Sequence, residues 1–270
     1  MTGHGNVPWV VAALPPPPAT MSKLKYVVPN LFTVTSLGLG LASVTRSADG
    51  DYRLAAWMIL WGVLLDKLDG TAARLLHAES KVGGELDSFA DFTVFGIAPA
   101  ALLFFRLRET ASYEGATLPL LAGACALHAM ATAGRLARFN ISSPPQGDRL
   151  FYGIPGTLMG AILASSYLTW DKHGANEQLL IFSPAVLVVG AVLMISTIRL
   201  PKLKARKSKL INLFQGANVA AAYVLAPLML LPEYLMTLAL SYTVGGILWC
   251  WAYPPRGEPQ RISRPPAPAG

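Results

Sequence analysis

The sequence predicts an all-α membrane protein, a polytopic bundle of about eight transmembrane helices. Of its 270 residues, 53% are hydrophobic and only 14% are charged, with a mean hydropathy of +0.44. A soluble domain carries about 25% charged residues. Long apolar runs also recur along the chain, each near the roughly 20 residues that an α-helix needs to cross a bilayer. These two observations predict one membrane bundle rather than one or two soluble domains.

Eight apolar segments account for the predicted spans. They are residues 29–46, 53–69, 87–105, 117–138, 152–170, 179–198, 211–231 and 234–252. The last two are separated only by Pro232 and Glu233, which predicts a tight hairpin between them. The histidines show no ligand spacing, and we expect His128, on an apolar helix, to be a packing residue.

The two ends of the chain differ from the middle in composition. Residues 1–20 include the proline run Pro15–Pro18, so we expect a disordered N-terminal extension, with Met21 as an alternative natural start. Residues 254–270 are rich in Pro, Gly and Arg, and we expect a disordered tail. The predicted membrane domain therefore covers residues 21–253.

The basic residues predict the orientation. If the N-terminus is cytosolic, seventeen of the 22 Lys and Arg residues fall on the cytosolic side. This asymmetry favours both termini in the cytosol and an even number of spans, with six or ten still open. Although the net charge is +7, the bases lie mostly in short loops between apolar segments. They therefore suit anionic lipid at the membrane surface, and no nucleic-acid partner is expected.

The residues with the clearest chemistry lie between positions 66 and 91. They form the pattern D-x2-D-G-x2-A-R-x8-G-x3-D-x3-D, whose acids are Asp66, Asp69, Asp87 and Asp91. The first part repeats at i, i+3, i+4, i+7 and i+8, and the second every four residues, so each part occupies one helix face. Because the link between them is short, the two helices can run antiparallel and bring four carboxylates together near the cytosolic surface.

Four close carboxylates in apolar spans would repel one another and would be costly to bury. A divalent cation removes both penalties. Oxygen ligands suit Mg²⁺ or Mn²⁺, and no His or Cys is placed to favour zinc. Two such ions would serve a substrate that contains pyrophosphate. The alternative is that these acids belong to a solvated cytosolic loop.

Three neighbours of the acids are also candidates for binding. Gly70 and Ala73 remove bulk from the same helix face, which suits either a flat base or phosphate, or close helix packing. Arg74 could neutralise a phosphate or simply mark the cytosolic end of a span.

The whole pattern fixes eight positions in 26 residues, and it resembles without departure the signature of the CDP-alcohol phosphatidyltransferase family. The resemblance implies a six-helix core with two added C-terminal helices. It implies that the four acids hold two metal ions and that Asp91 also acts as general base on the acceptor hydroxyl. The expected CDP-binding residues are Gly70, Ala73, Arg74, Gly83, Asn30 and Thr33. Asn30 and Thr33 could instead be a helix cap and filler, because their segment, Pro29–Thr33, begins the first span.

Three further segments resemble the phosphatidylserine synthases of that family: Gly134–Asn140, Phe151–Pro155 and Met194–Lys204. They imply transfer of the phosphatidyl group from CDP-diacylglycerol to L-serine, giving phosphatidylserine and CMP. The candidates for binding serine or lipid phosphate are Arg138, Asn140, Arg135 and Arg199. The arginines could instead be positive-inside anchors.

Two other functions stay open at this point. One is a sibling transferase whose acceptor is glycerol 3-phosphate, choline or inositol phosphate. The other, more remote, is a polytopic cation transporter that uses intramembrane acids. The resemblance also implies a homodimer in a bacterial inner membrane, with the active site on the cytosolic side.

Overall fold

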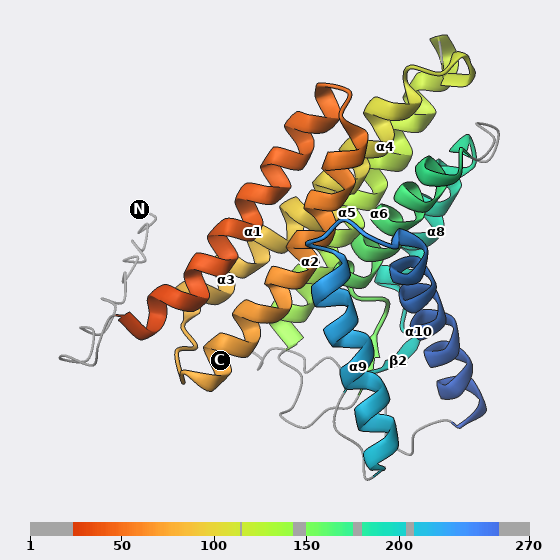
Figure 1. Ribbon diagram of the computed structural model, residues 1–270. Helices are drawn as coiled ribbons and strands as arrows, with labels where there is room; N and C mark the ends of the chain where they lie inside the picture. The colour runs from red at the N-terminus through yellow and green to blue at the C-terminus, as the bar shows by residue number, and fades with distance from the viewer. Residues whose placement is uncertain (1–23, 114, 143–149, 175–179, 204–207, 254–270) are drawn as a thin grey trace, which may run out of the picture.

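The structure is a computed structural model that describes residues 24–113, 115–142, 150–174, 180–203 and 208–253 (Figure 1). The two terminal segments predicted to be disordered, 1–20 and 254–270, lie outside the described residues. Among the described residues, a helix occupies each of the eight predicted spans. The helices are α1 (Leu24–Ala48), α2 (Tyr52–Leu75), α3 (Lys81–Asp91), α4 (Ala98–Leu107), α5 (Leu118–Ser142), α6 (Gly156–His173), α8 (Ser183–Ile195), α9 (Lys209–Leu225) and α10 (Pro232–Ala252).

One predicted span, 87–105, is built from three helical pieces. α3 continues through a π-helical stretch, η1 (Phe92–Ile97), into α4, so that Lys81–Leu107 forms one rod. Two short 3₁₀ turns, η2 (Ala111–Tyr113) and η3 (Gly115–Thr117), then lead into α5.

Four of the described helical segments are long and apolar enough to cross a membrane. They are Tyr26–Ala48, Lys81–Leu107, Leu118–Ile141 and Pro232–Ala252, and Ser183–Ile195 is a shorter apolar helix. The expectation of an all-α membrane bundle is confirmed at this level, whereas the count of eight spans stays a prediction.

The predicted span boundary at residue 152 is wrong because a strand of a small sheet occupies it. β1 (Leu150–Tyr152) pairs antiparallel with β2 (Arg199–Pro201), with Tyr152 opposite Arg199. Gly153 follows β1 with φ +76°, a conformation that does not continue a helix. A Cβ atom there would lie 2.3 Å from the carbonyl oxygen of Met194. α6 therefore begins at Gly156 rather than at residue 152.

The turn before the last helix also differs from the prediction. α9 ends at Leu225, and α10 begins at Pro232, so the connection is residues 226–231 rather than the pair Pro232 and Glu233. The end of α9 is consistent with Pro227, which has no backbone N–H to donate to the carbonyl of Tyr223. Pro232 suits the first position of α10, where a missing N–H is tolerated.

The N-terminal part of α1, the turn between α2 and α3, and the end of α5 lie at one end of the bundle (Figure 1). α9 and α10 lie along the side of the bundle away from α1. α9 contributes no buried residue, and two hydrogen bonds join α2 to α9 and to Ala226, the residue that follows it. Trp61 Nε1 donates to Ala226 O at 2.9 Å, and the Tyr223 hydroxyl donates to Leu64 O at 3.0 Å.

Candidate functional site

Three of the predicted acids meet at the end of the bundle where α2 turns into α3. Asp66 and Asp69 come from α2 and Asp87 from α3, and one oxygen of each lies within 4.8 Å of the others. α2 ends at Leu75, and the side chain of Ser80 caps α3 by accepting from Gly83 N at 3.0 Å. The five residues between these helices reverse the chain, which is the arrangement that the sequence spacing predicted.

Asp91, at the C-terminal end of α3, adjoins this group. Its carboxyl lies against that of Asp66 and interacts electrostatically with both Asp66 and Asp87. The structure thus brings all four predicted acids to one place, three in a tight group and the fourth beside it.

The acid cluster fits a divalent cation by its charge and by an unmatched oxygen. Asp66 Oδ2 is buried and has no hydrogen-bond partner among the described residues. Lys67 Nζ lies 3.2 Å from it as an ion pair, without hydrogen-bond geometry. A buried acceptor without a partner is unfavourable, and oxygen-only ligands are what Mg²⁺ and Mn²⁺ prefer.

α1 forms the second wall of the site. The Thr33 hydroxyl is buried, 3.0 Å from Asp69 Oδ2 and 3.1 Å from its own-helix carbonyl at Pro29. Asn30 lies one turn earlier and faces Gly83, where a Cβ atom would come within 3.2 Å of Asn30 Oδ1. A larger residue at 83 would therefore press on both Asn30 and the capping Ser80 hydroxyl.

The face of α2 that carries Gly70 is open. A Cβ atom at Gly70 would meet only the Arg74 guanidinium, at 3.5 Å and beyond. Arg74 is exposed, and its Nη2 donates to Thr71 Oγ1 at 3.4 Å. Ala73 lies on the same side, half-buried. An approaching phosphate would thus find small residues and one cation on this face.

The two arginines near the end of α5 have different surroundings. The Arg138 guanidinium donates to three backbone carbonyls, those of Ile195 at 2.7 Å, Tyr152 at 3.1 Å and Met194 at 3.3 Å. Arg138 therefore ties α5 to β1 and to the end of α8. The Arg135 guanidinium interacts electrostatically with Asp91 and Asp66. Its Nε is buried and, within the described part of the chain, has no hydrogen-bond partner.

The remaining two predicted residues lie in different places. Asn140 Nδ2 donates to Ser88 Oγ at 3.0 Å, which links the end of α5 to α3 beside Asp87. Arg199 lies in β2, and its charge is near the thiol of Cys250 in α10. No hydrogen bond or ion pair joins Arg199 to the acids across the described ranges.

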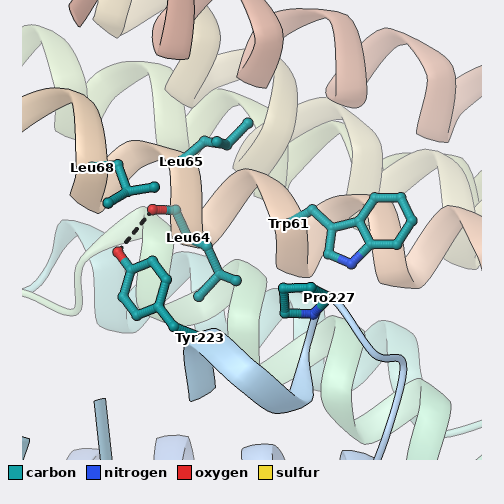
Figure 2. A pocket seen from close by; sticks show the side chains of 6 residues that line it. All are labelled: Trp61, Leu64, Leu65, Leu68, Tyr223 and Pro227. Atoms are coloured by element: carbon teal, nitrogen blue, oxygen red, sulfur yellow. Dashed lines mark hydrogen bonds between the residues drawn. The ribbon is translucent and has the colours of Figure 1, made fainter. Parts of the chain in front are cut away.

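An apolar cavity of about 300 Å³ lies between α2 and α9 (Figure 2). Its lining residues are Trp61, Leu64, Leu65, Leu68, Tyr223 and Pro227. The polar atoms of Trp61 and Tyr223 are engaged with backbone carbonyls, so almost only apolar surface faces the cavity. Leu65 and Leu68 of the lining each precede one of the acids, Asp66 or Asp69, in α2, so the cavity lies on the same helix as the acids but on another face.

Sequence reasoning did not single out this cavity. A signal was present in α2, because positions 61, 64, 65 and 68 form an apolar stripe at helical spacing, on a face other than that of the acids. Nothing in the local sequence around Tyr223 indicates that it would lie against α2, since the two residues that its hydrogen bond joins are 159 positions apart.

Fold and site together define an integral membrane protein with a cluster of carboxylates, suited to a divalent cation, at one end of a helical bundle. The sequence profile of the CDP-alcohol phosphatidyltransferase family matches residues 26–197, a range that contains all four acids. The chain belongs to the CDP-alcohol phosphatidyltransferase family, whose members depend on a divalent metal.

Several relatives carry a more specific name. A CDP-diacylglycerol–serine O-phosphatidyltransferase of Helicobacter pylori is 35% identical over 186 residues, covering 67% of this chain and 75% of the relative. One of Bacillus subtilis is 32% identical over 194 residues, covering 70% and 97%. An archaetidylserine synthase of Methanothermobacter thermautotrophicus is 30% identical over 180 residues, covering 65% and 70%.

Proposed function

We propose that this protein transfers the phosphatidyl group of CDP-diacylglycerol to the hydroxyl of L-serine, giving phosphatidylserine and CMP. The observation that carries the proposal is the group formed by Asp66, Asp69 and Asp87, in a chain whose relatives are named as serine phosphatidyltransferases. The names of the bacterial relatives and of the archaeal relative all specify serine, which supports serine over the other acceptors.

In the proposed site, Asp66, Asp69, Asp87 and Asp91 hold Mg²⁺ or Mn²⁺, in two positions. When bound, the metal supplies charge neutralisation to the pyrophosphate and to departing CMP. Gly70, Ala73 and Gly83 leave room for the CDP moiety beside Asn30 and Thr33. Arg74, exposed at the open face, pairs with a phosphate of the donor.

Asp91 performs the proton transfer in this proposal. Its carboxylate takes the proton of the serine hydroxyl. The serine oxygen then forms a bond to the lipid-side phosphorus, and the bond from that phosphorus to the CMP oxygen breaks. CMP leaves with the electron pair, and the proton stays on Asp91 until it is released to solvent. The position of Asp91 at the edge of the acid group supports this role.

Of the arginines, Arg135 is the better placed to receive the serine carboxylate. It lies near Asp91, and its buried Nε lacks a partner in the described part of the protein. A guanidinium pairs well with a carboxylate because it can donate two parallel hydrogen bonds. Arg138 donates to three backbone carbonyls and Asn140 donates to Ser88. In this proposal the two residues position the backbone around the serine subsite without contacting serine. Arg199 in β2 would meet lipid phosphate at the membrane surface.

The apolar cavity beside Tyr223 supports a lipid donor. Leu65 and Leu68 line it and are neighbours in sequence of Asp66 and Asp69, so a donor whose pyrophosphate lies at the acids can place an acyl chain there. Because the bilayer is already apolar, the cavity would hold the chain by van der Waals packing rather than by the hydrophobic effect.

The membrane arrangement is part of the proposal. The membrane domain, residues 21–253, would cross a bacterial inner membrane eight times as a homodimer, with the acids and both termini in the cytosol. The distribution of basic residues supports this orientation. Reporter fusions at each loop test the topology, and light scattering of the detergent-solubilised protein tests the dimer.

The deciding experiment is CMP release from CDP-diacylglycerol by the purified protein, with Mn²⁺ or Mg²⁺, with and without L-serine. Release that requires both metal and serine, with phosphatidylserine as product, is the expected result. Release with glycerol 3-phosphate, choline or inositol phosphate instead would overturn the acceptor. A second candidate function, favoured by the archaeal relative, is the same transfer to serine from a CDP-activated ether lipid. Running both donors side by side separates the two.

A further inference from the structure

The rod that carries Asp87 and Asp91 changes its geometry immediately after Asp91. From Phe92 to Ile97 it is π-helical, and Ala98 N donates to Thr93 O, five residues back. Pro99 follows at the start of α4. In an α-helix the N–H of residue 99 would donate to Phe95 O, but proline has no N–H and its ring collides with that carbonyl. The wide turn is therefore consistent with the displacement that Pro99 imposes on Phe95 O.

His128 of α5 supplies a donor for this carbonyl. Its Nε2 lies 3.0 Å from Phe95 O, and the residue is fully buried. Because a carbonyl oxygen only accepts, Nε2 carries the hydrogen. The other ring nitrogen, Nδ1, is buried and has no hydrogen-bond partner within the described ranges. The imidazole thus makes one directional contact, to the carbonyl that proline leaves without its α-helical donor.

Glycines of the surrounding helices hold the same stretch by close packing. A Cβ atom at Gly62 of α2 would lie 2.5 Å from the Val94 side chain, and one at Gly40 of α1 would lie 2.9 Å from it. A Cβ atom at Gly160 of α6 would lie 2.7 Å from the Phe95 ring. Val94 and Phe95 are both buried. Val94 and Phe95, which lie within the wide turn, are therefore fixed in rotation by the neighbouring helices.

The rotation of the segment before the wide turn depends on that turn. A π-helical turn holds one residue more than an α-helical turn, and one residue corresponds to about 100° of rotation about the axis. If Phe92–Ile97 became α-helical while Val94 and Phe95 stayed in place, that change in rotation would be divided between α3 and α4, and α3 would rotate by part of it. Asp87 and Asp91 would then turn away from Asp66 and Asp69.

We propose that His128 is a positioning residue: by donating to Phe95 O, it holds the π-helical turn that aims Asp87 and Asp91 at Asp66 and Asp69. The importance of this aim for catalysis rests on the proposed function, whereas the geometry does not. His128 touches neither the acids nor the substrate in this proposal, and it acts through the backbone of Phe92–Ile97.

The test is a cysteine cross-link that reports the rotation of α3 directly. Ser88 lies between Asp87 and Asp91 and contacts Asn140 of α5 at 3.0 Å. Ser88→Cys and Asn140→Cys are combined in the full chain, with Cys125 and Cys250 replaced by alanine, and oxidative cross-linking is measured in membranes. The variants compared are His128→Phe, which keeps the ring and removes the donor, and His128→Gln, which keeps an N–H donor.

The cross-link should form with His128, be lost with His128→Phe and return with His128→Gln. In the chain with native cysteines, His128→Phe should weaken Mn²⁺ binding and lower kcat by roughly 100-fold or more, since a misplacement of even about 1 Å can cost that much. Any rise in the KM for serine should be small by comparison. A folded His128→Phe protein that keeps its cross-link overturns the proposal, and so does a cross-link absent with His128 in place.

His128→Leu gives a second arm if His128→Phe does not fold. Leucine removes the donor to Phe95 O without adding bulk, so this variant should fold and still lose the cross-link. A retained cross-link there contradicts the proposal. Since the cross-link needs neither CDP-diacylglycerol nor serine, it decides the matter even if the wild-type protein releases no CMP, a result that would contradict the proposed function alone.

Discussion

The Thr33 hydroxyl and the Asp69 carboxylate, 36 positions apart in the sequence, meet at 3.0 Å in a buried contact between α1 and α2. A hydrogen bond to a charged group is worth about 1.5–3 kcal/mol, and this one also fixes which way the carboxylate faces. We therefore expect Thr33→Val, which has the same shape, to weaken Mn²⁺ binding about 10-fold, and Thr33→Ser to retain most of it.

Thr35→Val is the matched control for this prediction. Thr35 is on the same helix, exposed, and donates only to its own helix at Leu31 O, 2.7 Å away. Mn²⁺ titration of the purified proteins measures the effect. Equal affinities for Thr33→Val and Thr35→Val would show that the contact with Asp69 does not matter for the metal.

Asp91 and Asp66 should respond differently to neutralisation. Asp91→Asn is expected to lower kcat by about 10²–10⁴-fold, the usual contribution of a general base, while CDP-diacylglycerol binding survives. Asp66→Asn should instead weaken metal and donor binding, because its carboxylate belongs to the tight group of three. Glu85→Gln, an exposed acid on α3, is the control. Loss of donor binding in Asp91→Asn, to the degree found for Asp66→Asn, would refute the base assignment.

The two arginines of α5 should separate binding from stability. Arg135→Gln removes a guanidinium that interacts with Asp91 and Asp66, so the KM for serine should rise about 10-fold or more while the melting temperature changes little. Arg138→Gln deprives three carbonyls of their donor and should lower the stability by about 1–3 kcal/mol.

Steady-state kinetics with varied serine and a thermal melt of each variant decide this pair. A serine KM that rises only in Arg138→Gln would reverse the assignment and favour Arg138 as the acceptor residue. A KM for CDP-diacylglycerol that rises as much as that for serine in Arg135→Gln would argue against a serine-specific role.

Filling the cavity beside Tyr223 should change the preference for donor chain length. Leu64→Trp places bulk between α2 and α9, where Leu64 lines the cavity. The excluded part of the chain would lose its packing contacts, so the KM for a long-chain donor should rise several-fold while that for a short-chain donor stays unchanged. Val192→Trp, on an exposed position of α8, is the control. An equal rise for both donors would mean that no acyl chain occupies the cavity.

The meeting of the acids could be predicted from the sequence because it depends on local spacing. Asp66 and Asp69 share one helix face, Asp87 and Asp91 share another, and the link is too short to separate them. The same spacing could not reveal the π-helical turn after Asp91. Residues 87–105 were expected to form an ordinary span, and the wide turn reflects the neighbouring Pro99 together with a donor, His128, that is 33 positions from Phe95.

The small sheet and the partners of Arg138 were missed for a related reason. Gly153 and the strand pairing between Leu150–Tyr152 and Arg199–Pro201 join segments about 50 positions apart, and no local periodicity reports such pairing. The sequence indicated Arg138 as a cation near the site. The carbonyls that occupy it become visible only when α5 is placed against β1 and the end of α8.

α9 buries no residue. Tyr223 joins it to Leu64 of α2, Tyr234 of α10 donates to its Asn218, and Trp61 of α2 donates to Ala226, which follows it. An element with so few buried contacts is the one whose local opening costs least free energy. In hydrogen exchange we expect the amides of α9 to lose protection first. A lipid diffusing in the plane of the bilayer would then reach the side of α2 by displacing α9. The helices that carry the acids would not move. Substrate entry and the rigidity of the site would therefore depend on different parts of the molecule.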